Sequence, residues 1–245
     1  MLTAIAGILV LLAFYYAYRS LKRPGFAFGL ALSIYAFEQV LQQQGNSFLL
    51  ARSSLINFLF AGTAGLAGMM SILRGQLSLN RSPVGALCAY ALFLMAFLSL
   101  AWSVDFKTSQ KWLITFLPYA VMFTFLAPLC VTRGKDIADA IESLRVVGFF
   151  VALAMAFGTY GHRGIIITDL TGHEIEGNPL AAGTFGGYLL IAGVFSIYSG
   201  KRRGIKFLFN LLIAALGLYT VYRSGSRGQT IGAIIAVMFL SLIHI

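Results

Sequence analysis

The feature that most restricts the fold of this chain is a series of long apolar runs separated by short polar loops. A helix needs about 20 mostly apolar residues to cross the hydrocarbon core of a bilayer. In lipid, a single segment can satisfy its own backbone hydrogen bonds only as a helix. We therefore predict an all-α, polytopic transmembrane bundle of about nine spans. The spans are expected near 2–18, 25–41, 55–73, 84–101, 112–131, 146–160, 180–199, 207–222 and 230–245.

The composition supports lipid rather than water as the surroundings of these helices. Of 245 residues, 59% are hydrophobic and 11% are charged, whereas a soluble domain carries about 25% charged residues. The net charge of +10 does not indicate nucleic acid, because the basic residues lie in short loops between apolar runs. We expect residues 1–245 to form a single transmembrane domain.

The Lys and Arg residues alternate between rich and poor loops along the chain. Twelve of the 18 lie in one set of loops and six lie in the other. The rich loops are 19–24, 74–83, 132–145 and 200–206. The poor loops are 42–54, 102–111, 161–179 and 223–229. By the positive-inside rule, the rich loops are cytoplasmic and the poor loops face outward.

The outward stretch RSGSRGQ (223–229) is the first candidate binding site. Arg223 and Arg227 sit on the side of the membrane where basic residues are disfavoured. Guanidinium groups match phosphate oxygens with two parallel hydrogen bonds, so two of them suit a diphosphate. Ser226 adds a donor, and the glycines let the backbone approach a ligand. The alternative is that the arginines reach toward lipid headgroups without binding a specific ligand.

The long outward loop YGHRGIIITDLTGHEIEGNPLAAG (160–183) is the second candidate. Its polar residues include Arg163, His173, Glu176 and Asn178. Their spacing matches no metal-binding pattern, so we predict no metal site. The Gly-Asn-Pro turn at 177–179 leads into a helix, since Pro is favoured at the first helical position. The start of that helix would direct backbone N–H groups at a nearby anion.

Three segments in order resemble one family of bacterial envelope proteins. They are LSLAWSVDFKTS (98–109), GNPLAAGTFGGYLL (177–190) and YRSGSRGQTIGAII (222–235). Their order and spacing are similar to the Trp-Ser-x-Asp, Asn-Pro-Asn and Ser-Arg-Gly segments of the O-antigen ligase and O-antigen polymerase family. The resemblance covers roughly residues 84–239. One departure is that the Asn-Pro-Asn segment reads Asn178-Pro179-Leu180 here.

The resemblance implies a multi-pass glycosyltransferase of the bacterial inner (plasma) membrane with a GT-C-like helical fold. Its donor would be a glycan on undecaprenyl diphosphate, and its acceptor would be a lipid A core sugar or another glycan. The leaving group is already activated, so no nucleotide, metal or other cofactor is expected. Arg227, as the Ser-Arg-Gly arginine, would bind the diphosphate and stabilise its developing charge. We assign the same diphosphate-binding role to Arg223, because it lies close to Arg227 in the sequence.

The resemblance also implies that part of the enzyme lies beyond this chain. The family's catalytic loop, with its general base, follows the Ser-Arg-Gly helix, so we expect this chain to be inactive by itself. The final LSLIHI (240–245) matches one reading frame of a sequencing-library adapter. We therefore expect a gene fragment whose genuine sequence ends near Phe239.

A glycolipid or small-solute transporter or flippase is the alternative function. Glu38, near the outer end of the second span, is the residue that this alternative would use, because a carboxylate at membrane depth is a functional candidate. A transporter is expected to place polar groups at the bilayer midplane. Here they concentrate in the outward loops, which favours the transferase.

Overall fold

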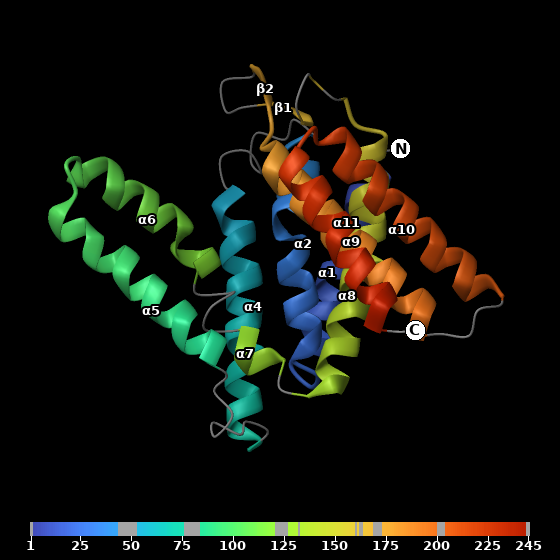
Figure 1. Ribbon diagram of the computed structural model, residues 1–245, viewed down its shortest axis with the longest axis horizontal. Coiled ribbons are helices and arrows are strands. Elements are labelled where there is room, and N and C mark those ends of the chain that lie inside the picture. The colour runs from blue at the N-terminus through green and yellow to red at the C-terminus, as the bar shows by residue number, and fades with distance from the viewer. Residues whose placement is uncertain are drawn as a thin grey trace. The chain divides into compact units, whose positions relative to one another are not determined.

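The computed structural model describes the chain except for residues 1, 44–52, 76–83, 121–126, 132, 160, 162–163, 169–172, 200–203 and 244–245. The described part is mostly helical, with one two-stranded sheet, so the prediction of a mainly helical chain is confirmed. The longer elements are α1 (Leu2–Ser20), α2 (Gly25–Gln42), α4 (Ser53–Leu73), α5 (Val84–Leu98), α6 (Phe106–Ala120), α8 (Gly134–Ala156), α9 (Pro179–Ser199), α10 (Ile205–Arg223) and α11 (Arg227–Ile243) (Figure 1). The shorter elements are η2 (Ser99–Trp102), α7 (Ala127–Cys130), β1 (Ile166–Thr168) and β2 (Glu174–Glu176).

The chain divides into two compact units. The first unit comprises Met1–Tyr15, Leu32–Ser53 and Ile141–Ile245. The second comprises Tyr16–Ala31 and Ser54–Ala140. Each of the helices α1, α2 and α8 is divided between the two units, with one part in each. The two units are described separately below.

The core of the first unit is the close antiparallel packing of α9 on α10 (Figure 1). Glycine makes the contact possible, because it lets two helix backbones approach without an intervening side chain. A Cβ atom on Gly186 would lie 2.8 Å from the carbonyl oxygen of Gly217, and one on Gly193 would lie 2.8 Å from the backbone nitrogen of Ala214. Gly186 and Gly193 therefore serve helix packing.

Helix α11 packs on another side of α9 and runs parallel to it. Gly183 of α9 faces Gln229, and Gly187, one turn later, faces Ala233. Leu190, Ala214 and Ala233 form a buried apolar cluster that joins the three helices. The parallel register places the first turns of α9 and α11 at the same end of the unit.

A small hairpin, β1–β2, precedes α9 in the first unit. Ile166 pairs with Glu176, and Thr168 pairs with Glu174, in an antiparallel register. The sequence predicted only a polar loop here. The strand preference of β-branched residues explains β1, which reads Ile-Ile-Thr.

In the second unit, several helix boundaries differ from the predicted spans. Helix α6 begins at Phe106, six residues before the predicted start at 112, because Asp105 caps it: the Asp105 Oδ1 atom accepts a hydrogen bond from the Thr108 backbone N–H at 3.1 Å. The short α7 packs near α4, where the Cys130 thiol donates to the Ala64 carbonyl at 3.5 Å. Between α6 and α7, residues 121–126 lie outside the described part of the chain.

Most of the predicted cytoplasmic loop at 132–145 is helical and forms the first half of α8. The start of α8 is fixed by Asp136, whose Oδ2 atom accepts a hydrogen bond from the Arg133 backbone N–H at 2.9 Å. This acidic side chain in the first turn also suits the positive end of the helix dipole. The helix then continues without a break into the apolar residues that follow.

Large apolar side chains are exposed on several helices of both units. They include Leu92, Leu94, Met95, Phe97, Leu211, Leu212, Leu218, Ile231, Ile234, Met238 and Phe239. Among the described residues, two helices are long and apolar enough to cross a membrane, Pro179–Ser199 and Ile205–Arg223. Length and composition alone are a weak hint of membrane association, because a buried core helix can pass the same test. The nine predicted spans therefore remain a prediction.

The α9–α10 contact yields a stability prediction. Gly186→Ala should lower the free energy of unfolding by about 1–3 kcal/mol, because the new methyl group meets backbone atoms that cannot move aside. The matched control is Gly187→Ala, whose Cβ would lie at an ordinary 3.8 Å from that of Ala233. Both variants gain the same helix propensity, so their difference isolates the clash. The measurement is thermal unfolding in detergent micelles, and equal midpoints for the two variants would contradict the packing.

Candidate functional site

The stretch RSGSRGQ forms the turn between α10 and α11. Helix α10 ends at Arg223, and Ser224 follows as its C-cap. Gly225 has a φ angle of +65°, the left-handed conformation with which helices commonly end. The Gly225 N–H donates to the Tyr222 carbonyl at 3.2 Å, and the Ser224 hydroxyl donates to the Val221 carbonyl at 2.7 Å. Ser224 and Gly225 thus serve to terminate α10.

The second half of the stretch starts α11. Ser226 occupies the N-cap position, and its hydroxyl donates to the Oε1 atom of Gln229, three residues later. A Ser followed three residues later by Gln is the sequence pattern of a capping box. The Ser226 carbonyl accepts from the Thr230 N–H at 3.1 Å and from the Thr230 hydroxyl at 3.0 Å. Ser226 is only 8% exposed, so its side chain stabilises the start of the helix.

The two arginines of the turn lie on its surface. Arg223, at the end of α10, and Arg227, at the start of α11, are both exposed. The turn therefore divides its residues into two groups. The serines, Gly225 and Gln229 shape the backbone, while the guanidinium groups of Arg223 and Arg227 are the exposed charged donors. Of the three residues predicted to bind the diphosphate, Arg223 and Arg227 are exposed, so a bound molecule could reach them.

Asn178, from the second candidate loop, forms the N-cap of α9. Its Oδ1 atom accepts hydrogen bonds from the backbone N–H groups of Leu180 at 2.9 Å and of Ala181 at 3.4 Å. Pro179 is the first residue of the helix, as predicted. Asn178 is exposed, and its side chain already satisfies two of the N–H groups left unpaired at a helix start.

The structure brings the two candidate regions together at one end of the first unit. A Cβ atom on Gly183, in the second turn of α9, would lie 2.8 Å from the Ser224 hydroxyl and 3.1 Å from the Gln229 Cβ. The RSGSRGQ turn therefore packs directly against the beginning of α9. Because α9 and α11 run parallel, their two positive helix ends lie on the same side as Arg223 and Arg227. This combination of charges favours an anionic ligand.

The other predicted residues of the long loop lie on the hairpin or outside the described part of the chain. His173, just before β2, and Glu174 and Glu176, within it, are exposed. Gly161 lies close to the carboxylate of the exposed Glu176. Arg163 is not among the described residues, so its predicted role stays untested. Within the described residues, no group of three His, Cys, Asp or Glu is arranged to hold a metal ion.

Two residues that the sequence analysis did not single out also reach this site. Gln39 and Gln43 lie one turn apart at the end of α2. The Gln39 Nε2 atom donates to the Asn178 carbonyl at 3.3 Å, and the Gln43 Nε2 atom donates to the Ile166 carbonyl at 3.5 Å. The run of glutamines after an apolar helix was the available signal, but only the fold shows what these side chains contact.

The Trp-Ser-x-Asp segment lies in the second unit. Asp105 is fully exposed, and hydrogen bonds from the Thr108 side chain and backbone lower the pKa of its carboxyl group. The Ser103 and Ser109 hydroxyls are 2.6 Å apart and share a hydrogen bond. Both interactions organise the start of α6. Of the three segments that carry the family resemblance, the structure thus brings the second and third into contact within one unit.

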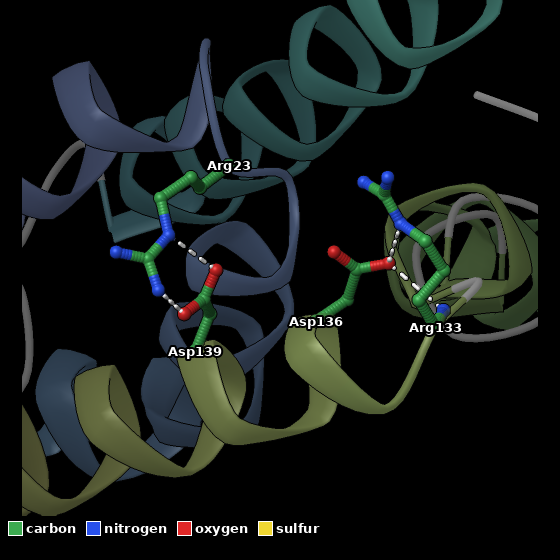
Figure 2. A network of polar contacts seen from close by, with 4 residues as sticks. All are labelled: Arg23, Arg133, Asp136 and Asp139. Carbon is green, nitrogen blue, oxygen red and sulfur yellow. Dashed lines mark hydrogen bonds and ion pairs between the residues drawn. The ribbon is translucent and has the colours of Figure 1, made fainter. Parts of the chain in front are cut away.

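An ion pair between Arg23 and Asp139 lies in the second unit (Figure 2). The guanidinium and carboxylate groups meet as a two-pronged pair, with the Arg23 Nε atom 2.7 Å from Asp139 Oδ2. The Arg23 Cζ atom also lies 4.9 Å from the centroid of the buried Phe26 ring. Figure 2 shows the neighbouring pair of Arg133 and Asp136 at the start of α8. These contacts attach α8 to the residues before α2, so this network has a structural role.

The comparisons with known proteins identify no relative of this chain. No family model, curated protein or solved structure matches this chain. The function must therefore be inferred from the residues and their arrangement.

The ion pair predicts that its two single variants lose unequal amounts of stability. Arg23→Ala should destabilise the protein more than Asp139→Ala, because Asp139 has only 2% of its side chain exposed, whereas that of Arg23 is 36% exposed. In Arg23→Ala the Asp139 charge would stay buried after losing the guanidinium group, while in Asp139→Ala the Arg23 side chain can turn toward solvent. We expect losses of about 1–3 kcal/mol for the single variants. A double-mutant cycle in detergent should give a coupling of about 1 kcal/mol, and a coupling near zero would contradict the pair.

Proposed function

We propose that this chain binds a lipid-linked diphosphate and belongs to a membrane glycosyltransferase of the O-antigen ligase or polymerase type. The donor would be a glycan on undecaprenyl diphosphate, and the acceptor would be a lipid A core sugar or a glycan. In this proposal the chain crosses the bacterial inner membrane about nine times in a GT-C-like bundle. The diphosphate site faces outward and consists of Arg223, Arg227 and the adjoining helix starts.

One observation carries the proposal. Two parallel helices, α9 and α11, begin at the same end of the first unit, and Arg223 and Arg227 are exposed on the turn that packs there. Helix starts attract anions through their N–H groups and dipoles. A planar guanidinium group pairs with two phosphate oxygens at once. A ligand with two adjacent phosphate groups fits two arginines better than a single anion does.

The surface of the helices supports a lipid-borne ligand. Apolar side chains such as Leu218 on α10 and Ile231 on α11 are about half exposed or more. A soluble monomer rarely exposes contiguous apolar surface of this kind. In a bilayer these side chains would contact acyl chains, and a polyprenyl tail could lie along the same helices. The basic turn at the end of the helices would then lie at the level of the headgroups.

Binding of undecaprenyl diphosphate to the chain in lipid nanodiscs tests the proposal directly. Arg227→Ala should weaken binding by about 10–100-fold, because it removes one charge-assisted pair with the diphosphate. Arg227→Lys should weaken binding less, since the positive charge remains and only the paired hydrogen bonds of the guanidinium group are lost.

The control for this experiment is Lys206→Ala. Lys206 is an exposed basic residue in the first turn of α10, at the end opposite Arg223. Its replacement changes the net charge equally but should leave the affinity unchanged. Undecaprenol, which lacks phosphate, should bind no variant measurably. Equal affinity of wild type and Arg227→Ala for undecaprenyl diphosphate would exclude the proposed site.

Cysteine labelling tests the side of the membrane on which the turn lies. Gly228, beside Arg227, and Gly134, at the start of α8, both have open space where a Cβ would be placed. In a background with Cys88 and Cys130 replaced by alanine, Gly228→Cys should react with an impermeant maleimide added to intact cells. Gly134→Cys should react only after the membrane is opened. The reverse pattern would invert the topology and place the turn in the cytoplasm.

A further inference from the structure

Three segments of the second unit that are far apart in the sequence meet around the turn between α1 and α2. The Arg74 Nη1 atom, directly after α4, donates to the Leu21 carbonyl of this turn at 2.6 Å. Two residues further along the same turn, Arg23 pairs with Asp139 of α8 (Figure 2). The turn is therefore attached to the end of α4 on one side and to the first half of α8 on the other.

The carboxylates of these segments are buried, whereas four of their basic side chains are exposed. Asp136 and Asp139 are both buried, and each pairs with an arginine of the same unit. The exposed basic residues are Lys22, Arg74, Arg133 and Lys135. We call the surface formed by these four residues the basic surface. Because the neighbouring carboxylates are buried, the basic surface presents positive charge to its surroundings.

Each of the three segments also exposes a large apolar or aromatic side chain close to its charge. These side chains are Tyr18, which is 68% exposed, Leu73, which is 72% exposed, and Ile137, which is 48% exposed. Nucleic acid would contact the basic groups but would leave these side chains in water. At a membrane surface, apolar and aromatic side chains enter the boundary between headgroups and acyl chains, while basic groups attract anionic lipids. The combination therefore fits a lipid surface better than a soluble polyanion.

We propose that the basic surface binds the headgroups of anionic phospholipids at the cytoplasmic face of the membrane. Its residues fall in the loops 19–24, 74–83 and 132–145, which the distribution of Lys and Arg predicts to be cytoplasmic. The cytoplasmic leaflet carries a negative surface potential, and basic residues beside helix ends at that face bind acidic headgroups. The basic surface belongs to the second unit and the diphosphate site to the first, so this inference does not depend on the proposed glycosyltransferase function.

The test compares phosphatidylglycerol with phosphatidylcholine of the same acyl chains, each titrated onto the chain in a neutral detergent and counted by native mass spectrometry. The wild type should bind phosphatidylglycerol about tenfold more tightly or better, since each basic residue near an anionic headgroup contributes about fivefold. The double variant Lys22→Gln/Lys135→Gln should reduce this preference by about fivefold or more. Glutamine keeps the polarity and the helix propensity of lysine, so the change is mainly one of charge.

The matched control is the double variant Lys107→Gln/Lys206→Gln, which removes the same charge from two exposed lysines outside the basic surface. It should keep the full preference. Raising the salt concentration from about 0.1 M to about 1 M should remove the preference of the wild type, because the screening length falls from about 10 Å to about 3 Å. Thermal unfolding identifies any variant that loses its fold. In that case the single variant Lys22→Gln or Lys135→Gln replaces the pair and should reduce the preference about twofold or more.

Three results would overturn the inference. Equal binding of the two lipids by the wild type would show that the basic surface does not select anionic headgroups. An unchanged preference in Lys22→Gln/Lys135→Gln, or an equal loss in the control variant, would show that the preference does not arise at this surface. Inorganic phosphate at the same concentration as the lipid should not compete, and equal competition would assign the surface to free anions. None of these results bears on the binding of undecaprenyl diphosphate at Arg223 and Arg227.

Discussion

The first unit depends on the contact between the backbones of α9 and α10. Without side chains at Gly186, Gly193 and Gly217, the two helices approach closely enough for backbone atoms to touch. Close van der Waals packing of this kind holds the two helices together, and it is the kind of contact that holds helices together in lipid. The same contact aligns the end of α10 with the start of α9. The position of the RSGSRGQ turn beside the start of α9 follows from that alignment.

Much of the helical structure could be predicted from the sequence, because apolar runs bounded by Gly, Pro or charged residues leave few choices. Helices α9 and α10 begin and end within two residues of the predicted spans. Errors arose where a local cap acted against the apolar pattern, as Asp105 does at the start of α6. The hairpin was missed because its strands contain only three residues each, too few to show an alternating pattern.

The candidate site could be predicted only in part. Arg223, Arg227 and Asn178 could be picked out as candidates, because two arginines in a loop predicted to face outward and an Asn-Pro helix start are local signals. The closeness of the RSGSRGQ turn to the start of α9 could not be predicted, because it depends on which face of α9 packs against α10. Gln39 and Gln43 belong to a helix more than a hundred residues earlier in the chain. Ser226 was assigned as a donor to a ligand, whereas its hydroxyl bonds to Gln229.

In RSGSRGQ, the residues that shape the turn differ from those that carry its charge, and this affects how the sequence can change in evolution. Ser226 and Gly225 shape the turn, whereas Arg227 carries charge at its surface. Under the proposed function, selection for folding and selection for binding would therefore act on different codons. Under that proposal, a descendant that no longer bound an anion could replace the exposed Arg227 and still fold, provided that Ser226 and Gly225 were kept. Retention of Arg227 in a lineage would, under the same proposal, record continued binding of the anion.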